Sequence, residues 1–490
     1  MSFHSIDYLL FLPLVVVLHF LTPQRWRWVV LLAVSMGFYA AWRLDFLWLL
    51  WVSTLVDYLV ARRMPGVATP WKRRALLGVS LTVNLGLLFT FKYFALFANT
   101  GLQLLHGGDA GAFDPVNLLL PLGISFYTFQ TLGYTIDVFR GRRKPETHLG
   151  YFAVYVMYFP QLLAGPIERP GSLLPQLHKT RVFDVGVAAA GGALMLIGYF
   201  KKLVIADRLA AIVPQILQSP SDHAPLTVLL AAFGEIYRYY ADLSGYADIA
   251  IGSSLILGIR LTRNFNRPFS AVSVSEFWQR WHITVSRWFR DYVYLPLGRG
   301  KGKAWRKPVA TFVTMVLVAM WHGAAWTWLA AGVITGLVMI GEGWLRRSPS
   351  AAAISHRLAR IGGLTRPVEV GVQNALNRVV LWVLLIGIGS MLSAPSWAHV
   401  GGVWMQILRI PSSLFAMPGD LLSSVALVPR YLLIAILALE AYQWLDAREP
   451  VFQRLRQRRL WISWGFYLAL IAVILMFGTF DKPGFLYFNF

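Results

Sequence analysis

The chain alternates between long apolar runs and short loops that are mostly basic. A transmembrane helix needs about 20 predominantly apolar residues, and a count along the chain gives roughly eleven such runs. The clearest of them cover Tyr8–Leu21 and residues 28–42, 45–60, 75–98, 117–138 and 461–478. This pattern predicts an all-α, multi-pass membrane protein in which residues 1–490 form a single integral-membrane domain.

The positions of Lys and Arg predict the orientation of these runs. Cytoplasmic loops carry an excess of Lys and Arg, whereas the segment Gly107–Asp114 has neither. The first apolar run has no basic start and no small-residue cleavage site, so it is expected to be a span and not a cleaved signal. The basic positions recur after every second run, at Arg25 and Arg27 and in the loops at residues 62–74, 140–144 and 448–459. Both chain ends are therefore expected outside, on the side of the membrane opposite the cytoplasm.

Some apolar segments are interrupted and are not expected to be simple spans. Leu118–Thr135 and Gly150–Gly165 contain Pro, Gly and Gln. Such breaks are tolerated at membrane depth only where protein or a water-filled cavity covers the backbone. These two segments are expected to be broken or re-entrant. The stretches at residues 345–376 and 403–425 are too charged or too short to cross and are expected to lie on the membrane surface.

Composition supports a membrane protein and excludes several kinds of chemistry. The chain is 57% hydrophobic and 14% charged, whereas soluble domains are about 25% charged. Its net charge of +22 would suit either nucleic-acid binding or basic cytoplasmic loops, and the hydropathy favours the loops. No nucleic-acid partner is expected. The absence of cysteine excludes disulfides, thiolate nucleophiles and Cys-ligated metals.

His322 is the clearest polar residue inside an apolar run. It lies in Val309–Ala331, just after a basic loop that includes Arg306, which puts it about 20 Å from the cytoplasmic end of a helix. Gly323 and the two alanines after it would let another chain or a substrate approach closely. A buried polar side chain in a membrane is costly and often functional. From this position alone, His322 is either a general base or a hydrogen-bonded link between helices.

A second histidine, His282, lies in the Trp- and Arg-rich stretch Glu276–Asp291. This amphipathic stretch is typical of an interfacial or partly inserted helix, with its tryptophans forming an aromatic belt. Alternatively, Arg287 and Arg290 could hold an anionic group such as a phosphate. Three further polar residues of an apolar region are interpreted as cross-links between helices rather than as a catalytic triad: Asp242, Ser244 and Asp248.

Several catalytic motifs are missing. No His is followed five positions later by Asp, and the chain has no Gly-x-Ser-x-Gly elbow. A P-loop, a dinucleotide-binding glycine pattern and metal-ligand spacing are absent too. No metal is therefore expected, and histidine remains the best candidate for a catalytic base.

Five strings, in order along the chain, resemble the membrane-bound O-acyltransferase family. Within it they are most similar to the alginate O-acetyltransferase branch, with the teichoic-acid D-alanylation acyltransferases as a more distant branch. The resemblance extends over about residues 5 to 490. The strings are Leu120–Gln130, Phe159–Arg169, Asn264–Phe269, Glu276–Asp291 and Met320–Gly323.

The resemblance implies a helical membrane core around a central tunnel. His322 matches the central catalytic histidine of the family, and His282 matches a second histidine nearer the cytoplasmic mouth. Trp321, Arg287 and Arg290 are expected to contact the acyl donor. That donor would be acetyl-CoA or an acyl carrier protein, with no permanently bound cofactor.

The last six residues, Phe485–Phe490, resemble a C-terminal aromatic element of the microbial branch. There a tyrosine, matched here by Tyr487, is thought to carry the acyl group. Alternatively, these residues form an aromatic anchor at the membrane interface.

The expected function is O-acetylation of an exopolysaccharide, with alginate as the first choice. Periplasmic acetyltransferases of the SGNH type would be the partners that complete the transfer. Two alternatives stay open at this point. One is a family member acting on cellulose, peptidoglycan or teichoic acid, and the other is a transporter without bond-making chemistry.

Overall fold

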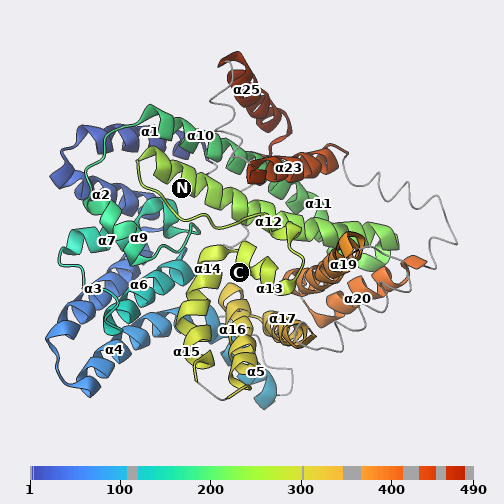
Figure 1. The fold of residues 1–490 in the computed structure, drawn as a ribbon, viewed down its shortest axis with the longest axis horizontal. Coiled ribbons are helices and arrows are strands. Elements are labelled where there is room, and N and C mark those ends of the chain that lie inside the picture. Colours follow the sequence, from blue (N-terminus) through green and yellow to red (C-terminus); the bar gives the residue numbers. More distant parts are fainter. Residues whose placement is uncertain are drawn as a thin grey trace.

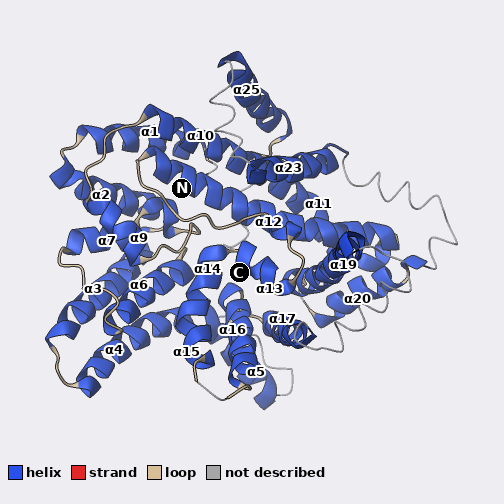
Figure 2. Ribbon diagram, viewed as in Figure 1, coloured by secondary structure: helices blue, strands red, loops and turns tan. Residues whose placement is uncertain are grey.

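The computed structural model describes residue 3 and residues 5–106, 120–300, 303–345, 366–394, 396–411, 430–448 and 460–480. These residues form helices joined by short loops, and no strand occurs among them (Figure 2). The prediction of an all-α protein is confirmed. Phe485–Phe490, with Tyr487, lies outside the described residues, as do residues 107–119 and 346–365.

The helices follow one another closely along the chain. Within the part of the chain that the structure describes, three π-helical turns interrupt or extend them, at Phe89–Tyr93, Phe200–Ala206 and Arg290–Tyr294. In chain order the helices are α1 (Ile6–Leu21), α2 (Arg27–Ala40), α3 (Leu47–Arg63), α4 (Pro70–Leu88), α5 (Phe94–His106), α6 (Ile124–Phe139), α7 (Leu149–Met157), α8 (Phe159–Leu162), α9 (Pro170–His178), α10 (Val185–Tyr199), α11 (Asp207–Gln218), α12 (Pro225–Ile256), α13 (Val274–Arg280), α14 (Ile283–Phe289), α15 (Leu295–Gly298), α16 (Arg306–His322), α17 (Trp326–Leu345), α19 (Arg366–Ser393), α20 (Trp397–Leu408), α23 (Arg430–Arg448) and α25 (Leu460–Phe477).

Several of these helices are long and apolar enough to cross a bilayer. Within the described residues there are five, and two shorter apolar helices, α1 and α25, accompany them. The protein is thus a multi-pass membrane protein, and the count of about eleven spans stays a prediction. The five are Leu44–Gly66, Pro70–Leu105, Val185–Gln218, Trp326–Leu345 and Asn374–Leu392.

The 32-residue helix α12 runs through the middle of the molecule, and α25 projects from its edge (Figure 1). Helix α10 packs along α12 through two glycine pairs, Gly191 with Gly252 and Gly198 with Gly245. A Cβ added to Gly191 would lie 2.6 Å from the carbonyl oxygen of Gly252, and one added to Gly198 would lie 2.7 Å from that of Gly245. Small residues let the backbones of membrane helices approach this closely. The pairing also shows that α10 and α12 are antiparallel.

We expect Gly191→Ala to destabilise the protein and Gly192→Ala to leave it intact. The added methyl at residue 191 meets backbone that cannot move aside, whereas a Cβ at Gly192 has nothing within 4 Å. Overpacking should lower the free energy of unfolding by about 1–3 kcal/mol for Gly191→Ala. Gly192→Ala should raise it by up to about 1 kcal/mol through helix propensity. Unfolding of the two variants in detergent measures this difference, and equal stabilities would contradict the packing.

Buried ion pairs join α12 to the π-helical turn that follows α10. Lys202 donates to the carboxylates of Asp242 at 2.6 Å and Asp207 at 2.8 Å, and Lys201 donates to Asp248 at 2.6 Å. Charges inside a membrane protein are tolerated when they are paired in this way. The interpretation of Asp242 and Asp248 as cross-links between helices is confirmed.

The two interrupted segments are not continuous helices, and most of their described residues are buried in protein. Gly123 has φ +75° and packs against the backbone of Leu162, and α6 begins immediately after it. Only glycine fits both the left-handed backbone and the close contact. Helices α7 and α8 meet at Tyr158, and their side chains from Phe152 to Leu162 are buried.

Two boundaries differ from the sequence prediction. Of the first predicted surface stretch, residues 345–376, the described residues 366–376 belong to α19, a helix of 28 residues. Residues 346–365 lie outside the described part, so their placement on the membrane surface stays a prediction. The second stretch, residues 403–425, begins within α20, and its residues 412–429 lie outside the described part.

The apolar run Val309–Ala331 is not one span, which corrects the sequence interpretation. Helix α16 ends at His322, the backbone is extended at Gly323, and α17 starts at Trp326. Gly332 packs against Val316 and Ala319, and Gly336 packs against Phe312, so the two helices form an antiparallel hairpin. His322 therefore lies at the tip of a helical hairpin. A substrate can reach a side chain at this position without any interruption in the middle of a helix.

Candidate active site

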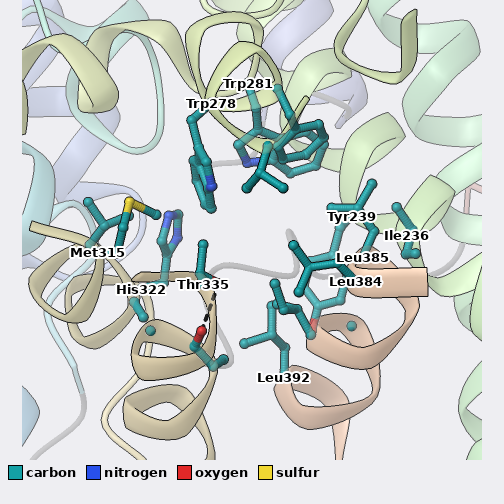
Figure 3. Close-up of a pocket in the computed structure, with 18 of the residues that line it drawn as sticks. Ile236, Tyr239, Trp278, Trp281, Met315, His322, Thr335, Leu384, Leu385 and Leu392 are labelled. Carbon is teal, nitrogen blue, oxygen red and sulfur yellow. Dashed lines mark hydrogen bonds between the residues drawn. The ribbon is translucent and has the colours of Figure 1, made fainter. Parts of the chain in front are cut away.

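His322 projects from the end of α16 into an apolar pocket (Figure 3). The pocket has about 990 Å³ of empty space, its open mouth included. In Figure 3 the His322 ring lies near Trp278 and Met315, and Leu384 and Leu385 lie across the pocket. The pocket is lined by residues of α12, α13, α16, α17 and α19, and nearly all of them are hydrophobic. His322 is thus a polar group at the edge of a space suited to apolar matter.

His282 occupies a break between two short helices, α13 and α14. Its backbone is left-handed, with φ +45° and ψ +52°. Asn264 holds this break open: its backbone carbonyl accepts the N–H of Ile283 at 2.8 Å, and its side-chain oxygen accepts the N–H of Thr284 at 3.1 Å. The stretch Glu276–Asp291 is consequently two helices and not the single interfacial helix that the sequence predicts. The break turns the His282 side chain into the protein, where it is 2% exposed.

The structure brings His282 and His322 together. Their ring centroids are 5.7 Å apart and their planes meet at 66°. Both are buried, and burial disfavours the charged form of an imidazole. The Nδ1 atom of His282 is buried and has no hydrogen-bond partner among the described residues. Because buried polar atoms are nearly always bonded, this nitrogen is a good candidate for a contact with substrate.

Trp321 lies against both histidines and fixes their surroundings. Its ring centroid is 4.7 Å from that of His322 and 5.8 Å from that of His282. Its indole N–H donates to the carbonyl of Ser125 at 3.2 Å, and its ring stacks on Phe129. Trp321 is 2% exposed and is not among the residues that line the pocket. Its contacts explain how α6 supports the site, whereas its predicted contact with a donor stays a prediction.

Arg287 and Arg290 are exposed at the other end of α14. Arg290 pairs with Asp291 at 2.9 Å, and Arg169 reaches the same carboxylate at 3.0 Å. Arg140, at the end of α6, donates to the carbonyl of Asp291 at 3.2 Å. We call these four arginines with Asp291 the arginine cluster. Its role in donor binding stays a prediction, but it joins the basic loop at residues 140–144 to the helix that begins at His282.

Sequence reasoning missed Lys92, which is 7% exposed and lies in the π-helical turn after α4. Its ammonium donates to the backbone carbonyls of Trp321 and His322. A signal was available, because Lys92 interrupts the apolar run at residues 75–98 and intramembrane charges mark functional positions. The signal for Asn264 was weaker, because the sequence pointed to it only as part of the family-like string Asn264–Phe269 and not by its own position.

Comparison with known proteins decides the family. The sequence profile of the MBOAT, membrane-bound O-acyltransferase family matches residues 117–372, which include both histidines. The chain belongs to the membrane-bound O-acyltransferase family. The resemblance seen in the sequence is confirmed, and the protein is a member of a family of acyltransferase enzymes.

Relatives of this chain within the family are named after different acceptor polymers. The probable alginate O-acetylase AlgI of Azotobacter vinelandii is 40% identical over 345 residues, which cover 69% of this chain and 67% of that protein. The peptidoglycan O-acetyltransferase of Helicobacter pylori is 31% identical over 348 residues, 65% of this chain and 64% of that protein. The teichoic acid D-alanyltransferase of Streptococcus thermophilus is 29% identical over 245 residues, 47% and 59% of the two chains. The match thus spans roughly two thirds or less of these relatives.

Proposed function

We propose that this protein transfers an acetyl group from a thioester donor to a hydroxyl group, with His322 as the general base. The observation that carries the proposal is the pairing of His322 with His282, ring centroids 5.7 Å apart, at the edge of an apolar pocket. The rings come from two elements that are 40 residues apart in the chain (322 − 282). The family membership supports acyl transfer as the reaction.

The proposed step is a single acyl transfer. The hydroxyl oxygen of the acceptor attacks the thioester carbonyl carbon, while His322 removes the hydroxyl proton. The carbon–sulfur bond breaks, and the thiolate leaves with the electron pair and takes the proton back from His322. The products are an acetyl ester and a free thiol. His282 would donate a hydrogen bond to the carbonyl oxygen as negative charge develops there, which is the kind of stabilisation that contributes most in such reactions.

The donor would approach from the side of the arginine cluster, which we place in the cytoplasm by the positive-inside rule. Acetyl-CoA and acyl carrier proteins are both anionic, and arginine suits phosphate groups because its guanidinium can bond them in pairs. Arg287 and Arg290 lie five and eight residues after His282. At about 1.5 Å per residue, the cluster is roughly 8–12 Å along the helix from the histidine.

Alginate, or a closely related exopolysaccharide, is the proposed final acceptor. Five relatives named as probable alginate O-acetylases are 36–40% identical to the chain. Periplasmic acetyltransferases of the SGNH type would complete the transfer. Peptidoglycan is the second candidate acceptor, because a relative named peptidoglycan O-acetyltransferase is 31% identical to this chain. A pure transporter does not account for two histidines packed together beside the pocket.

Tyr487 is proposed as a relay for the acetyl group, so Tyr487→Phe should block polymer acetylation. A tyrosine phenol in a model peptide has a pKa near 10, so a phenolate is a better leaving group than the alkoxide of a sugar alcohol, and acyl relays of this kind split one difficult step into two. O-acetyl groups on the secreted polymer, measured by NMR, should fall to background. Phe485→Leu is the control, because it keeps an apolar residue in the same segment. Normal acetylation in Tyr487→Phe would reduce the segment to an anchor.

Gene deletion followed by complementation tests the proposed acceptor. The secreted polysaccharide and the peptidoglycan of the deletion strain are analysed separately for ester-linked acetyl groups. We expect acetyl to disappear from the polysaccharide alone and to return with the wild-type gene. Loss from peptidoglycan alone would replace the proposed acceptor by the second candidate, and no loss from either polymer would contradict both.

A further inference from the structure

Lys92 is a buried cation whose ammonium binds the end of the helix that carries His322. Its Nζ atom donates to the carbonyl oxygen of Trp321 at 2.6 Å and to that of His322 at 2.9 Å. The lysine and these carbonyls are about 230 residues apart in the chain. Lys92 therefore connects the first third of the chain directly to the backbone of the candidate base.

The two carbonyls need external partners because α16 ends there. The last carbonyl groups of an α-helix have no partner within the helix, and the extended backbone of Gly323, with φ −144°, ends the hydrogen-bond pattern. A positive charge at a helix C-terminus also interacts favourably with the helix dipole. The neighbouring Tyr93 adds to this arrangement, since its hydroxyl donates to the carbonyl of Met320 at 2.8 Å. Three consecutive carbonyls are thus bonded by two adjacent side chains.

The π-helical turn Phe89–Tyr93 places these two side chains. A π turn carries an extra residue and occurs frequently at functional sites. Burying an ammonium in a membrane protein costs free energy. If the two carbonyls only had to be bonded to hold the helices together, a neutral donor would do so without that cost. A cation is the stronger partner, because hydrogen bonds from a charged donor are shorter and about twice as strong as neutral ones.

We propose that Lys92 is a positioning residue for the acyl-transfer reaction. Its ammonium fixes the backbone at residues 321 and 322, and so fixes the direction in which the His322 imidazole enters the pocket. The inference rests on the proposed function, because it assigns a purpose to the orientation of the candidate base. In this role Lys92 acts through His322.

The test compares Lys92→Met with Lys92→Arg in the purified full-length protein, using acetyl-CoA and acetylated acyl carrier protein as parallel donors. Lys92→Met keeps the length of the side chain and removes its charge. We expect kcat to fall by about 10²-fold, since small misplacements of a catalytic group cost that much, while KM for the donor changes by less than about threefold. Lys92→Arg restores the charged donor and should recover kcat to within about tenfold of wild type.

Tyr93→Phe is the matched control at the same helix end. It removes a neutral hydrogen bond one residue further from His322 and should lower kcat by less than about fivefold. A role in stability alone would lower the unfolding temperature of Lys92→Met and leave kcat of the folded fraction unchanged. Unchanged kcat in Lys92→Met overturns the proposal. If Lys92→Met does not fold, Lys92→Gln replaces it, because its shorter side chain carries a neutral amide in place of the ammonium, and unchanged kcat there overturns the proposed role of the charged donor equally.

His322→Ala separates failure of this inference from failure of the proposed function. If His322→Ala is inactive and Lys92→Met retains full kcat, only the role of Lys92 is wrong. If His322→Ala keeps its activity, the proposed function itself is wrong, and Lys92 has no base to position.

Discussion

His322→Ala is expected to abolish acetyl transfer while the protein stays folded in the membrane. General-base catalysis contributes about 10²–10⁴-fold to a rate, so the residual acetylation of the polymer should fall below detection in cells. Lys92 donates to the backbone carbonyl of residue 322, which alanine also has, so His322→Ala keeps that hydrogen bond. Acetyl ester content of the secreted polymer, measured together with the amount of protein in the membrane, gives the result.

The matched control for His322→Ala is His178→Ala. His178 is an exposed histidine on α9 that pairs with Glu146 at 3.0 Å, and it has no part in the proposed chemistry. Its replacement should leave acetylation at the wild-type level. Persistent acetylation in His322→Ala at normal protein amounts would remove His322 from the mechanism.

His282→Asn is expected to have the second-largest effect, a fall of about 10²-fold in kcat/KM. The shorter asparagine places its amide short of the position of the imidazole ring, and loss of one correctly placed oxyanion donor typically costs this much. Asparagine is the appropriate replacement because residue 282 has φ +45°, and asparagine tolerates this left-handed conformation better than most residues. His282→Ala would add backbone strain to the loss of the imidazole. Donor-thioester kinetics on the purified variant measure the change.

Arg267→Asn controls for the left-handed backbone. Arg267 is the other residue besides His282, among the described non-glycine residues, with positive φ, at +49°. The substitution changes the same kind of position without removing an imidazole, so kcat/KM should stay close to wild type. Equal losses in Arg267→Asn and His282→Asn would indicate that backbone geometry, and not the histidine, is responsible.

The helical architecture could be predicted from the sequence because burial in lipid imposes long apolar runs on the chain. The run Tyr8–Leu21 is helix α1, and the run at residues 461–478 is helix α25 within one residue. The break near Gly123 could be anticipated from the interrupted pattern, and the structure adds the reason, a close contact with the backbone of Leu162. The local sequence was sufficient to predict these elements because apolar runs and a glycine, all local features, determine where they begin and end.

The hairpin of α16 and α17 could not be predicted in the same way. Val309–Ala331 is long enough to cross a bilayer, and a single glycine between apolar residues does not by itself end a membrane helix. The turn is decided by tertiary contacts, since Lys92 bonds the end of α16 and Gly332 packs on Ala319. The first of these contacts joins residues 229 apart in the chain, so no short stretch of sequence predicts it.

The candidate site was found in part. His322 and His282 were identified from their setting and from the family resemblance, but their contact depends on the helix break that Asn264 stabilises through the backbone of Ile283 and Thr284. Apolar periodicity along Glu276–Asp291 favours one continuous helix and conceals this break. The pocket beside His322 is formed by five helices, and only the folded structure brings their walls together.

The most direct test of the central claim follows the acetyl group itself. Purified full-length protein in lipid nanodiscs is incubated with acetyl-labelled acetyl-CoA and, in parallel, with acetyl-labelled acyl carrier protein. Release of free thiol and covalent label on the chain are measured for the wild type and for His322→Ala. We predict thiol release and labelling with at least one donor for the wild type, and neither for His322→Ala. Intact thioester with both donors, or equal labelling of the two proteins, would contradict the account.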